Sequence, residues 1–596
     1  MTGAAPGQPF ALFENNLAHP GSARLLEDCA GSLLLSDPAQ AAFFFAEIRR
    51  ALASGYWLAL AAHYELGHAL EHSLPAPPAS MPLARAWIFR RKQDLAGSEL
   101  DAWWAARLGH LTPQERDGGL LALNPCWSAA RHETAVRRVL AYIQAGDCYQ
   151  INLTFPFDGA IYGHPLALFQ RLREAQPVAH GVLIHDGTDW VLSRSPELFV
   201  ERKGKRLSCR PMKGTAARHA DPAQDSANAA ALLASDKERA ENLMIVDLIR
   251  NDLGRLTPAG GVSVARLFEL ETYASVFQLT SSIHAEPAEA DFATTMSALF
   301  PCGSVTGAPK IRAMQIIGEL EDDARGLYCG ALGWLAPDGD FSLNVPIRTL
   351  MVSADRRCRL NTGSGIVADS NPVAEYQECL AKAAFARQTA ESLGLIETLR
   401  WDGTRFPLLA GHLARLERSA HTLGFAHEPD RIEAEFARLQ DRLAKTPVRV
   451  RLLLARNGSF EIETAPLTPL PPENLFALAD WALDETDPRL CHKTTARVFY
   501  DDALKLATQR GLFDLLFCNR RGELAEGARS NLFIERDGAL LTPALSCGVL
   551  PGVLRASLLK QGTAREAVLY PEDLVRADRI WLGNALRGLV EVRLQP

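Results

Sequence analysis

The chain has 596 residues, of which 47% are hydrophobic and 22% are charged, and its mean hydropathy is -0.05. This composition is that of a globular protein with several hydrophobic cores. The net charge of -7 lacks the basic excess of a nucleic-acid-binding protein. No run approaches the ~18 apolar residues that a membrane span needs.

The start of the chain does not combine a charged region with a following apolar one, as a secretory signal would. The 11 cysteines are scattered singly, with neither a CxxC pair nor the Cys/His spacing of a zinc site. Such thiols are typical of a reducing compartment, so we expect a cytoplasmic protein. Length alone allows about four units of ~150 residues or two large domains.

Periodicity gives a first division of the chain. Alternation predicts a strand over 149–155, and helical spacing predicts helices over 236–255 and 372–393. Gly394 would end the second helix, and a strand should follow over 395–401. Because a second set of motifs begins there, we expect a domain over 1–390, with an N-terminal subregion 1–115 and core motifs over 120–390, and a second domain over 391–596.

Two charged residues in the first part have surroundings that suit chemistry. Glu197 follows a Ser–Pro corner and precedes an apolar strand. Burial there would raise its pKa and suit the carboxyl to donating a proton. Lys213 precedes a Gly–Thr pair and lies between Arg210 and Arg218 in the sequence. Nearby cations lower the pKa of a lysine, which leaves more of its amine free to act as a nucleophile.

Four glutamates form two pairs with the same spacing, Glu238 with Glu241 and Glu375 with Glu378. Residues three apart share one face of a helix, so each pair can direct two carboxylates at one spot. Two such helices meeting would form an oxygen-lined site suited to Mg²⁺ and an anionic substrate. On spacing alone, two solvated helix faces are the more common explanation.

Two glycine-rich segments, 300–310 and 361–370, are predicted to be turns. Such turns can present backbone N–H groups to a carboxylate. Taken singly, each is more often a structural turn.

In this order, these segments resemble the chorismate-utilising enzymes over roughly residues 120–390. The resemblance is carried by GDCYQINLTF (146–155), SRSPELFV (193–200), RPMKGT (210–215), ENLMIVDLIRNDLGR (241–255), FPCGSVTGAPKIRAMQIIGELE (300–321), RGLYCGALGW (325–334) and TGSGIVADSNPVAEYQE (362–378). It implies an α/β fold of the α+β kind, in which two large antiparallel sheets wrapped by helices form a sandwich with the site between them.

Two positions separate the reactions within the family. Members that add water to chorismate carry a lysine base where this chain has Gln150, and a neutral amide cannot deprotonate water. Anthranilate synthases carry alanine in the motif that reads PMKGT here. Lys213 is similar to the nucleophile of aminodeoxychorismate synthases, which attacks C2 of chorismate, expels the 4-hydroxyl and is displaced after ammonia adds at C4. The resemblance therefore implies a 4-amino product.

The resemblance also assigns roles to the other residues. Glu197 would be the general acid, and Glu241 and Glu378 would bind Mg²⁺ with Glu238 and Glu375 behind them. Substrate contacts are expected from Gln150, Thr215, Gln278, Thr306, Tyr328, Arg348, Gly363 and Gly365. Gln278 stands where many relatives have histidine, and an amide cannot carry that charge.

A glutaminase signature, with a cysteine in a Gly-x-Cys-x-Gly turn, is missing from the sequence. We therefore expect ammonia to come from a separate glutamine amidotransferase subunit.

The second set of motifs resembles fold-type IV pyridoxal-phosphate enzymes, a group that contains branched-chain and D-amino-acid transaminases and aminodeoxychorismate lyase. Its segments are 395–425, 492–504, 522–534, 540–555 and 581–588. The resemblance makes Lys493 the lysine that binds pyridoxal phosphate and shuttles protons, and Glu526 the partner of the pyridine nitrogen. The phosphate would be held by Arg415, the backbone N–H groups of Val553 and Leu554, and the turn at Asn584.

This module is short and lacks the first strand hairpin usual in such enzymes. Either the preceding domain completes its small lobe or its activity is weak. The motifs do not separate lyase from transaminase, but a neighbouring module that makes aminodeoxychorismate favours a lyase that yields p-aminobenzoate for folate synthesis. The alternatives are an anthranilate synthase component I fused to a branched-chain or D-amino-acid type aminotransferase, and a non-catalytic protein that retains the folds. A homodimer through this module is compatible with the resemblance.

Overall fold

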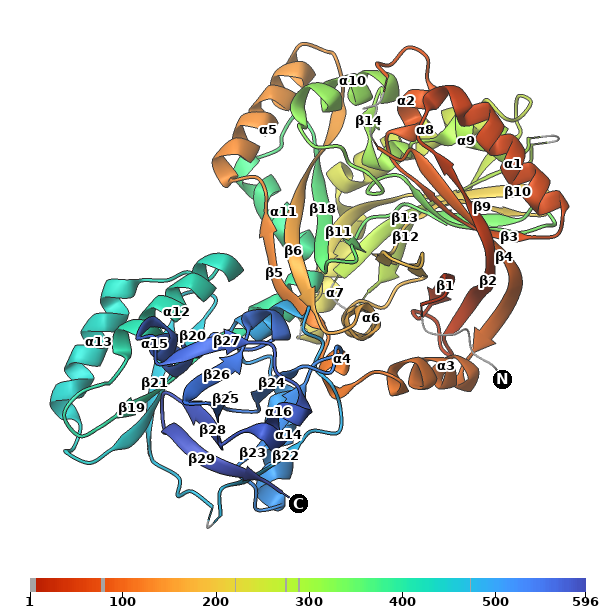
Figure 1. Ribbon diagram of the computed structural model, residues 1–596. Helices are drawn as coiled ribbons and strands as arrows, with labels where there is room; N and C mark the ends of the chain where they lie inside the picture. The colour runs from red at the N-terminus through yellow and green to blue at the C-terminus, as the bar shows by residue number, and fades with distance from the viewer. Residues whose placement is uncertain are drawn as a thin grey trace. The chain divides into compact units, whose positions relative to one another are not determined.

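The computed structural model describes residues 7–76, 81–219, 221–273, 276–287, 290–471 and 473–595. Its contacts divide the chain into two compact units (Figure 1). The first unit comprises Met1–Ala106, Pro125–Asp158 and Phe169–Phe385, and the second comprises Arg107–Asn124, Gly159–Leu168 and Ala386–Pro596. Two short segments from the first third of the sequence therefore belong to the second unit.

The strands up to residue 366 are hydrogen-bonded into an 18-stranded sheet system, and the registered pairs within it are antiparallel. They are β1 (Phe10–Asn15), β2 (Ser22–Leu35), β3 (Trp57–Ala62), β4 (Ala84–Ala96), β5 (Gly119–Pro125), β6 (Gln150–Tyr162), β7 (His180–His185), β8 (Trp190–Ser195), β9 (Leu198–Lys203), β10 (Arg206–Arg210), β11 (Met212–Ala217), β12 (Val262–Thr272), β13 (Val276–Ala285), β14 (Gly307–Ala308), β15 (Ala331–Leu335), β16 (Phe341–Asn344), β17 (Thr349–Val352) and β18 (Arg357–Ile366). The predicted α/β fold with antiparallel strands is confirmed.

The hydrogen bonds join these strands continuously instead of leaving two separate sheets. Register shifts at Cys29/Gly31, Ser208/Arg210 and Leu343/Asn344 interrupt the ladders of β2, β10 and β16. Such bulges bend and twist a strand, which allows one hydrogen-bonded system to curve round a core. One such core gathers aromatic and aliphatic side chains from β1, β3 and β4, including Phe13, Trp87 and Phe89.

Helices occupy the connections between these strands (Figure 1). They are α1 (Ala41–Ala53), α2 (Leu66–Leu70), α3 (Ser98–Gly109), α4 (Pro113–Arg116), α5 (Ala129–Gln144), α6 (Pro165–Ala175), α7 (Pro222–Ala234), α8 (Asp236–Gly254), α9 (Phe292–Leu299), α10 (Lys310–Leu320) and α11 (Pro372–Glu391). The helix predicted over 236–255 is confirmed as α8. Ser235 caps it by accepting a hydrogen bond from the Glu238 N–H, and its buried side chains, such as Ile245, Ile249 and Leu253, recur at helical spacing.

The second unit has two sheets of its own. A three-stranded antiparallel sheet contains β19 (Gly394–Trp401), β20 (Val448–Ala455) and β21 (Phe460–Pro466). A mixed eight-stranded sheet contains β22 (Leu475–Leu478), β23 (Asp514–Cys518), β24 (Leu524–Gly527), β25 (Asn531–Arg536), β26 (Ala539–Pro543), β27 (Ala564–Ala567), β28 (Arg579–Asn584) and β29 (Gly588–Leu594). The helices are α12 (Leu409–Leu423), α13 (Pro429–Arg442), α14 (Val498–Gln509), α15 (Val553–Lys560) and α16 (Pro571–Arg576), with a 3-10 helix η3 (Pro488–Cys491).

Alternation along β20 divides its two faces. Val450, Leu452 and Leu454 are buried in a core shared with α12 and α13. Arg449 and Arg451 project from the opposite face and line a cavity. The core on the apolar face also contains Leu121 and Tyr162, which come from the two early segments.

Two local predictions are wrong. Helix α11 ends at Glu391, and Gly394 is the first residue of β19 and not a helix stop. A Cβ on Gly394 would lie 2.7 Å from the Leu453 side chain, so the glycine lets that side chain of β20 pack closely against β19. Residues 361–366 form the end of β18 and not a turn. There too, a Cβ on Gly363 would lie 2.6 Å from the Leu153 carbonyl oxygen, so the glycine allows close approach to β6.

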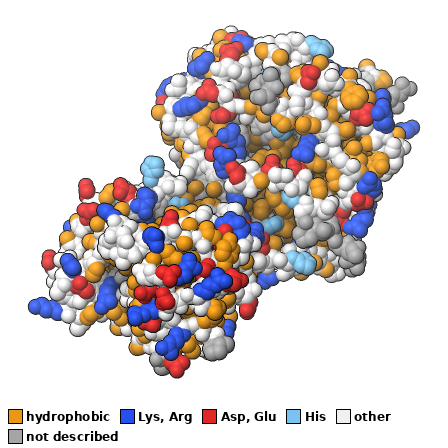
Figure 2. Space-filling view, in the orientation of Figure 1, with side chains coloured by type: hydrophobic (Ala, Val, Ile, Leu, Met, Phe, Trp, Pro, Cys, Tyr) orange, Lys and Arg blue, Asp and Glu red, His pale blue; other side chains and the backbone are white. Residues whose placement is uncertain are grey.

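Acidic and basic side chains are interspersed over the visible face of the molecule (Figure 2). In the described ranges, no helix combines the length and the apolar character needed to cross a bilayer.

Candidate active sites

The first candidate site is built where β6, β11 and β18 come together. A Cβ on Gly365 would lie 2.8 Å from Lys213 Nζ and 3.1 Å from Gln150 Nε2. The lysine amine and the glutamine amide therefore both lie against the backbone of β18, in space that the side chain of any other residue at this position would share. Asn242 of α8 secures this arrangement, because its amide donates to the Lys213 carbonyl at 3.4 Å and accepts from the Ser281 hydroxyl at 2.6 Å.

The pKa of Lys213 is lowered, and burial is the largest cause. Glu241 opposes this shift, whereas Lys382 adds to it by like-charge repulsion. The sequence predicted a lowered pKa but assigned it to the wrong cations. Arg210 pairs with Glu271 at 2.6 Å and Arg218 pairs with Asp225 at 2.9 Å, so both arginines are engaged with other groups.

Glu197 occupies the short link between β8 and β9, where it is buried. Burial raises the pKa of its carboxyl to about 7, while the Ser304 hydroxyl, which donates to Oε1 at 2.6 Å, and the charge of Lys213 act in the opposite direction. A carboxyl with this pKa is partly protonated at neutral pH. It can therefore donate a proton to a leaving group.

The two glutamate pairs lie on α8 and α11 as predicted, but their members have different partners. Burial and then the charge of Glu241 raise the pKa of Glu238, with a further contribution from Glu378. Glu378 forms a 2.7 Å ion pair with Lys382. Burial raises the pKa of its carboxyl, but the charge and hydrogen bond of Lys382, together with the charges of Lys213 and Lys237, lower it overall. Glu375 accepts a hydrogen bond from the Ser370 hydroxyl at 2.6 Å.

These carboxylates meet some, but not all, of the requirements of a binding site for a divalent cation. Among the residues that the structure describes, no group of three or more His, Cys, Asp or Glu side chains is arranged to hold a metal ion. Mg²⁺, however, is usually bound by one or two carboxylates together with substrate and water oxygens. The mutual repulsion of Glu238, Glu241 and Glu378 is the condition that a cation would relieve. Glu241 and Glu378 therefore suit a shared site that the substrate completes.

Several buried polar groups of this unit find no hydrogen-bond partner among the described residues. They include both amide atoms of Gln150, which lies beside Lys213, the hydroxyl of Thr362 on β18, and Nη1 of Arg348 before β17. Buried polar groups are nearly always paired in native proteins, so the unpaired amide of Gln150 beside Lys213 indicates a ligand site. Arg348 suits a carboxylate, and the amide of Gln150 suits either a donor or an acceptor.

The remaining predicted substrate residues have mixed surroundings. Thr306 is fully buried and its hydroxyl donates to the Cys302 carbonyl at 2.8 Å. Tyr328 is buried, whereas Thr215 is exposed. Gln278 is half-buried and faces Thr215 in the pairing of β11 with β13.

Sequence reasoning missed the role of Lys382. Its Nζ contacts Glu378 and donates to the Gly363 carbonyl at 2.9 Å, which links α11 to β18 beside Lys213. The i, i+4 spacing of Glu378 and Lys382 on one helix was a usable signal.

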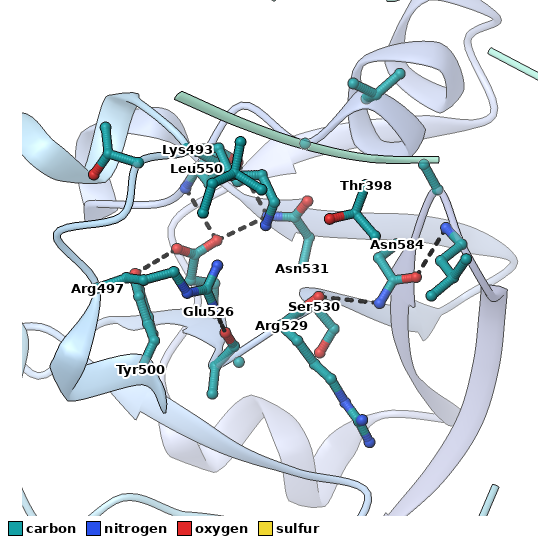
Figure 3. Close-up of a pocket in the computed structure, with 18 of the residues that line it drawn as sticks. Thr398, Lys493, Arg497, Tyr500, Glu526, Arg529, Ser530, Asn531, Leu550 and Asn584 are labelled. Atoms are coloured by element: carbon teal, nitrogen blue, oxygen red, sulfur yellow. Dashed lines mark hydrogen bonds between the residues drawn. The ribbon is translucent and has the colours of Figure 1, made fainter. Parts of the chain in front are cut away.

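The second candidate site is a cavity of about 510 Å³ within the second unit (Figure 3). It is lined by β19 and β20, the segment from Arg489 to Arg497, the start of α14, the ends of β24 and β25, and the turns before α15 and after β28. Lys493, Glu526, Arg415, Val553, Leu554 and Asn584 all line it. The structure therefore brings together all of the cofactor-binding residues predicted for this module.

Lys493 has a pKa lowered to about 7, first by burial and then by the charges of Arg497 and Arg415. Its carbonyl accepts a hydrogen bond from the Ile396 N–H at 2.8 Å, which ties the lysine to β19. A lysine with this pKa carries a substantial fraction of free amine at neutral pH.

Glu526 is buried, and its carboxylate accepts three hydrogen bonds. The Tyr500 hydroxyl donates at 2.6 Å, the Leu550 N–H at 3.0 Å and the Asn531 amide at 3.1 Å (Figure 3). Burial nevertheless raises its pKa to about 7. The sequence did not reveal Tyr500 or Asn531 as partners, although both lie inside the motif segments.

Arg415 is engaged more fully than the sequence suggested. Its Nε and Nη2 donate to the two oxygens of Glu397 at 2.9 and 2.6 Å, and His412 Nδ1 lies 2.6 Å from the same carboxylate. Glu397 is a residue that the sequence analysis missed. Arg415 Nη1 has only a weak 3.4 Å contact with the Pro551 carbonyl, so this nitrogen remains available to an anion.

Two turns line the cavity, one at the start of α15 and one after β28. Helix α15 starts at Val553, and the first N–H groups of a helix have no partner within it. The preceding Gly552 is required because a Cβ there would overlap Asn531 Oδ1. In the other turn, Asn584 Oδ1 accepts from the N–H groups of Leu586 and Arg587 at 3.1 and 2.9 Å.

The cavity lining is strongly cationic. Seven arginines and Lys493 line it, against two acidic residues, Asp501 and Glu526. Arg449, Arg451 and Arg587 are not among the predicted cofactor residues. Arg415 and Arg489 are paired with carboxylates outside the lining, so the excess of positive charge that favours an anionic ligand beyond the cofactor comes from the other arginines.

Comparison with known proteins identifies two families along the chain. The model of the chorismate binding enzyme family matches residues 24–388, and the model of class IV amino-transferases matches residues 394–594. Aminodeoxychorismate synthase component 1 of Bacillus subtilis (strain 168) is 37% identical over 309 residues, which are 51% of this chain and 65% of that protein. Anthranilate synthase component 1 of Streptomyces coelicolor is 41% identical over 263 residues, 43% of this chain and 51% of that protein.

The chain thus spans about half to two thirds of the length of these relatives. Among solved structures, anthranilate synthase component I from Streptococcus pneumoniae TIGR4 has a TM-score of 0.53 at 23% identity, over 65% of this chain and 94% of that chain. This likeness shows the fold of the first part.

Proposed function

Because the chain belongs to the chorismate binding enzymes and carries a class IV amino-transferase module after them, we propose that its first part converts chorismate and ammonia into 4-amino-4-deoxychorismate. The observation that carries this proposal is the position of the Lys213 amine, which lies against Gly365 beside the unpaired amide of Gln150. The two domains of the proposal are residues 1–390 and 391–596.

In the proposed reaction, the free amine of Lys213 attacks C2 of chorismate. Both ring double bonds shift and the 4-hydroxyl leaves as water, protonated by Glu197, whose raised pKa keeps part of it in the acid form. Ammonia then adds at C4, both double bonds shift back, and the lysine leaves C2. Arg348, with its unpaired Nη1, binds a substrate carboxylate.

Mg²⁺ bound to Glu241 and Glu378, with Glu238 and Glu375 behind them, would supply positive charge to the substrate carboxylates. The like-charge repulsion among three of these glutamates supports the placement. Titration of the protein with Mg²⁺ in the absence of substrate, followed by calorimetry, tests the site without reference to activity. Unchanged binding in a Glu241→Gln, Glu378→Gln double variant would mean that the metal lies elsewhere.

The competing function is that of an anthranilate synthase, a class that includes a relative of similar identity. Lys213 favours the 4-amino product because the lysine blocks direct attack of ammonia at C2 by occupying that carbon itself. Incubation with chorismate, ammonium and Mg²⁺, followed by product chromatography, separates the two. The expected product is 4-amino-4-deoxychorismate, and a peak with the fluorescence of anthranilate would refute the assignment.

We infer that ammonia reaches this site from a separate glutamine amidotransferase subunit. The relative from Bacillus subtilis is named as component 1 of its synthase. Glutamine should support the reaction only after such a subunit is added, whereas ammonium should support it alone. If glutamine fails even with the added subunit, this partner is ruled out.

We propose that the second part binds pyridoxal phosphate and releases pyruvate from 4-amino-4-deoxychorismate to give p-aminobenzoate, a precursor for folate synthesis. The cofactor, when bound, withdraws electrons from the substrate amine carbon. Lys493, with its pKa of about 7, would hold the cofactor and move protons, and Glu526 would pair with the ring nitrogen. The N–H groups of Val553 and Leu554, the turn at Asn584 and Arg415 Nη1 would hold the phosphate.

The arginines of the cavity support a lyase over a branched-chain transaminase. The substrate proposed here carries two carboxylates, which suit Arg449, Arg451 and Arg587, whereas an aliphatic side chain would need an apolar lining. The test supplies 4-amino-4-deoxychorismate or branched-chain amino acids to the protein with pyridoxal phosphate. Release of pyruvate and p-aminobenzoate is expected from the first, and amino transfer from the second alone would favour the alternative.

A further inference from the structure

Two segments from early in the chain, 107–124 and 159–168, are part of the second unit. They lie within residues matched by the chorismate binding enzyme family, not by the class IV module. Both reach the stretch of chain that leads from Asp484 to Lys493.

Arg489 lies in η3, shortly before Lys493, and its side chain is 1% exposed. Its Nη1 donates to Asp117 Oδ2 at 2.8 Å, and its Nη2 donates to the Gln114 carbonyl at 2.8 Å and to Asp487 Oδ2 at 2.8 Å. Two of the three residues that fix this guanidinium therefore belong to the early segment 107–124. Arg489 also borders the cavity that contains Lys493.

The same two segments also hold the residues that immediately precede η3. Gln114, which is buried, accepts from the Asp484 N–H at 2.7 Å and donates to Asp487 Oδ2 at 3.3 Å. The Gly163 N–H donates to the same Asp487 oxygen at 3.3 Å. Gly163 has a φ of +66°, and a Cβ there would lie 2.6 Å from the Asp117 carbonyl oxygen, so the two early segments pack directly on each other.

Apolar contacts join the early segments to the small sheet of the second unit. Leu121 and Tyr162 belong to one core with Leu399 of β19 and Leu416 of α12. The Tyr162 ring also lies beneath the Arg489 guanidinium, 4.5 Å from the ring centre. The early segments therefore contribute both to the core and to the buried charge network.

The segment around Lys493 is consequently held from two sides. On the side of β19, the Lys493 carbonyl accepts a hydrogen bond from the Ile396 N–H at 2.8 Å. On the side of η3, the early segments fix Asp487 and Arg489 through Asp117, Gln114 and Gly163. Without the contacts from the early segments, the buried Arg489 guanidinium would lose a charged partner. Asp487 and Arg489 would then no longer be held in their present positions.

We propose that residues 107–124 and 159–168 complete the cofactor site of the second unit, and that Asp117 and Gln114 are positioning residues that set the place of Lys493. The class IV module that begins at residue 394 is then not a self-sufficient enzyme. The identity of Lys493 as the cofactor lysine rests on the function proposed above, but the anchoring of residues 484–495 does not.

The test uses the full chain with Asp117→Ala, the milder Asp117→Asn and Gln114→Ala. Glu428→Gln is the matched control, since Glu428 is an exposed carboxylate of the same unit, 67% exposed. Two quantities are measured: hydrogen exchange of residues 484–495 without ligand, and the affinity for pyridoxal phosphate with its pH dependence. Thermal unfolding is recorded for every variant.

Asp117→Ala should accelerate exchange in 484–495 and weaken pyridoxal phosphate binding by about tenfold or more, because Arg489 is left buried without that partner. Asp117→Asn, which keeps an acceptor oxygen, should give a smaller effect in the same direction. Both should shift the pH midpoint of cofactor binding, a change that a loss of stability alone would not produce. Glu428→Gln should match the parent protein, and 4-amino-4-deoxychorismate formation should be unchanged in all variants.

Parent-like exchange and parent-like affinity in Asp117→Ala and Gln114→Ala would overturn the proposal. If Asp117→Ala prevents folding of the second unit, Asp117→Asn and Gln114→Ala decide. If the parent protein binds no pyridoxal phosphate, the proposed function fails, and the exchange of residues 484–495 still tests the anchoring on its own.

Discussion

Lys213 in the first unit and Lys493 in the second both have a pKa lowered mainly by burial, but their charged neighbours differ in sign. Around Lys213, Glu241 is the strongest neighbour and works against burial by stabilising the ammonium form. Around Lys493, Arg497 and Arg415 are the strongest neighbours and add to burial, which brings the pKa to about 7.

This difference shows that burial alone does not tell how much free amine a lysine presents. At Lys493 the three largest influences favour the neutral amine, as a site that must bond a carbonyl cofactor requires, and Glu397 and Glu526 oppose them only in part. At Lys213 the acidic neighbours stabilise the charged ammonium form of the lysine until a cation neutralises their carboxylates. A cation bound at Glu241 and Glu378 would remove that restraint, so metal binding and nucleophile activation should be coupled in the first unit only.

The largest expected effect is at Lys493. Lys493→Ala should abolish covalent retention of pyridoxal phosphate, because no other amine is held in that position by the Ile396 contact. Borohydride reduction followed by mass measurement of the intact chain reports retention directly. Lys505→Ala is the control, since Lys505 is exposed on α14 of the same unit. Retention equal to the parent in Lys493→Ala would show that a different lysine binds the cofactor.

The next effect is at Lys213. Lys213→Ala should lower formation of 4-amino-4-deoxychorismate by on the order of a thousandfold or more, as loss of a nucleophile does. Chorismate binding, measured by calorimetry, should remain detectable because Arg348 is intact. Lys205→Ala, at an exposed position, should leave the rate unchanged. A fully active Lys213→Ala variant would mean that ammonia attacks chorismate directly.

Glu197→Gln should reduce the same rate by about 10²–10⁴-fold, the usual contribution of a general acid. The raised pKa of about 7 also fixes the sign of the pH dependence. The acid form is lost as pH rises through this value, so the parent rate should fall above about pH 7. The glutamine variant should lack this limb, and a retained limb would assign it to a different group.

Arg497→Gln tests whether the charge of Arg497 lowers the pKa of Lys493. Removing a cation raises the pKa of the lysine, whose free amine predominates above about pH 7 in the parent. Pyridoxal phosphate attachment should therefore need a pH higher by roughly one unit in the variant. Stopped-flow absorbance across a pH series gives the midpoint. No shift, or a shift to lower pH, would contradict the assigned cause.

The smallest expected effect is at Glu241. Glu241→Gln removes the strongest group that opposes burial at Lys213, so the pKa of this lysine should fall further. The Mg²⁺ concentration needed for half-maximal rate should rise at the same time. Exposed Glu319→Gln serves as the control. Identical Mg²⁺ titrations for the parent and Glu241→Gln would place the metal away from this residue.

Much of both sites could be predicted because the determinants are local. The helical spacing of apolar residues predicted α8, and the position of Glu197 between a Ser–Pro pair and an apolar strand predicted its burial. The order of motifs after residue 395 located Lys493 and Glu526 in one cavity. Each of these inferences depends on residues close together in the sequence.

The inferences that failed depend on partners distant in the sequence. The neighbours of Lys213 in the chain, Arg210 and Arg218, have acidic partners of their own, and Lys382 takes the effect assigned to them. Glu397, which neutralises much of Arg415, lies on a strand whose pattern signals only burial. The glycines of β18 were read as a turn because sequence does not reveal that another strand passes close by.

The early segments of the second unit have a consequence for synthesis of the chain. Leu121 and Tyr162 leave the ribosome long before Leu399, Leu416 and Arg489, their partners. At roughly 5–20 residues per second, this interval lasts tens of seconds. The second unit can therefore fold only after its later residues have been synthesised. During this interval Leu121 and Tyr162 lack their partners and can be bound by chaperones.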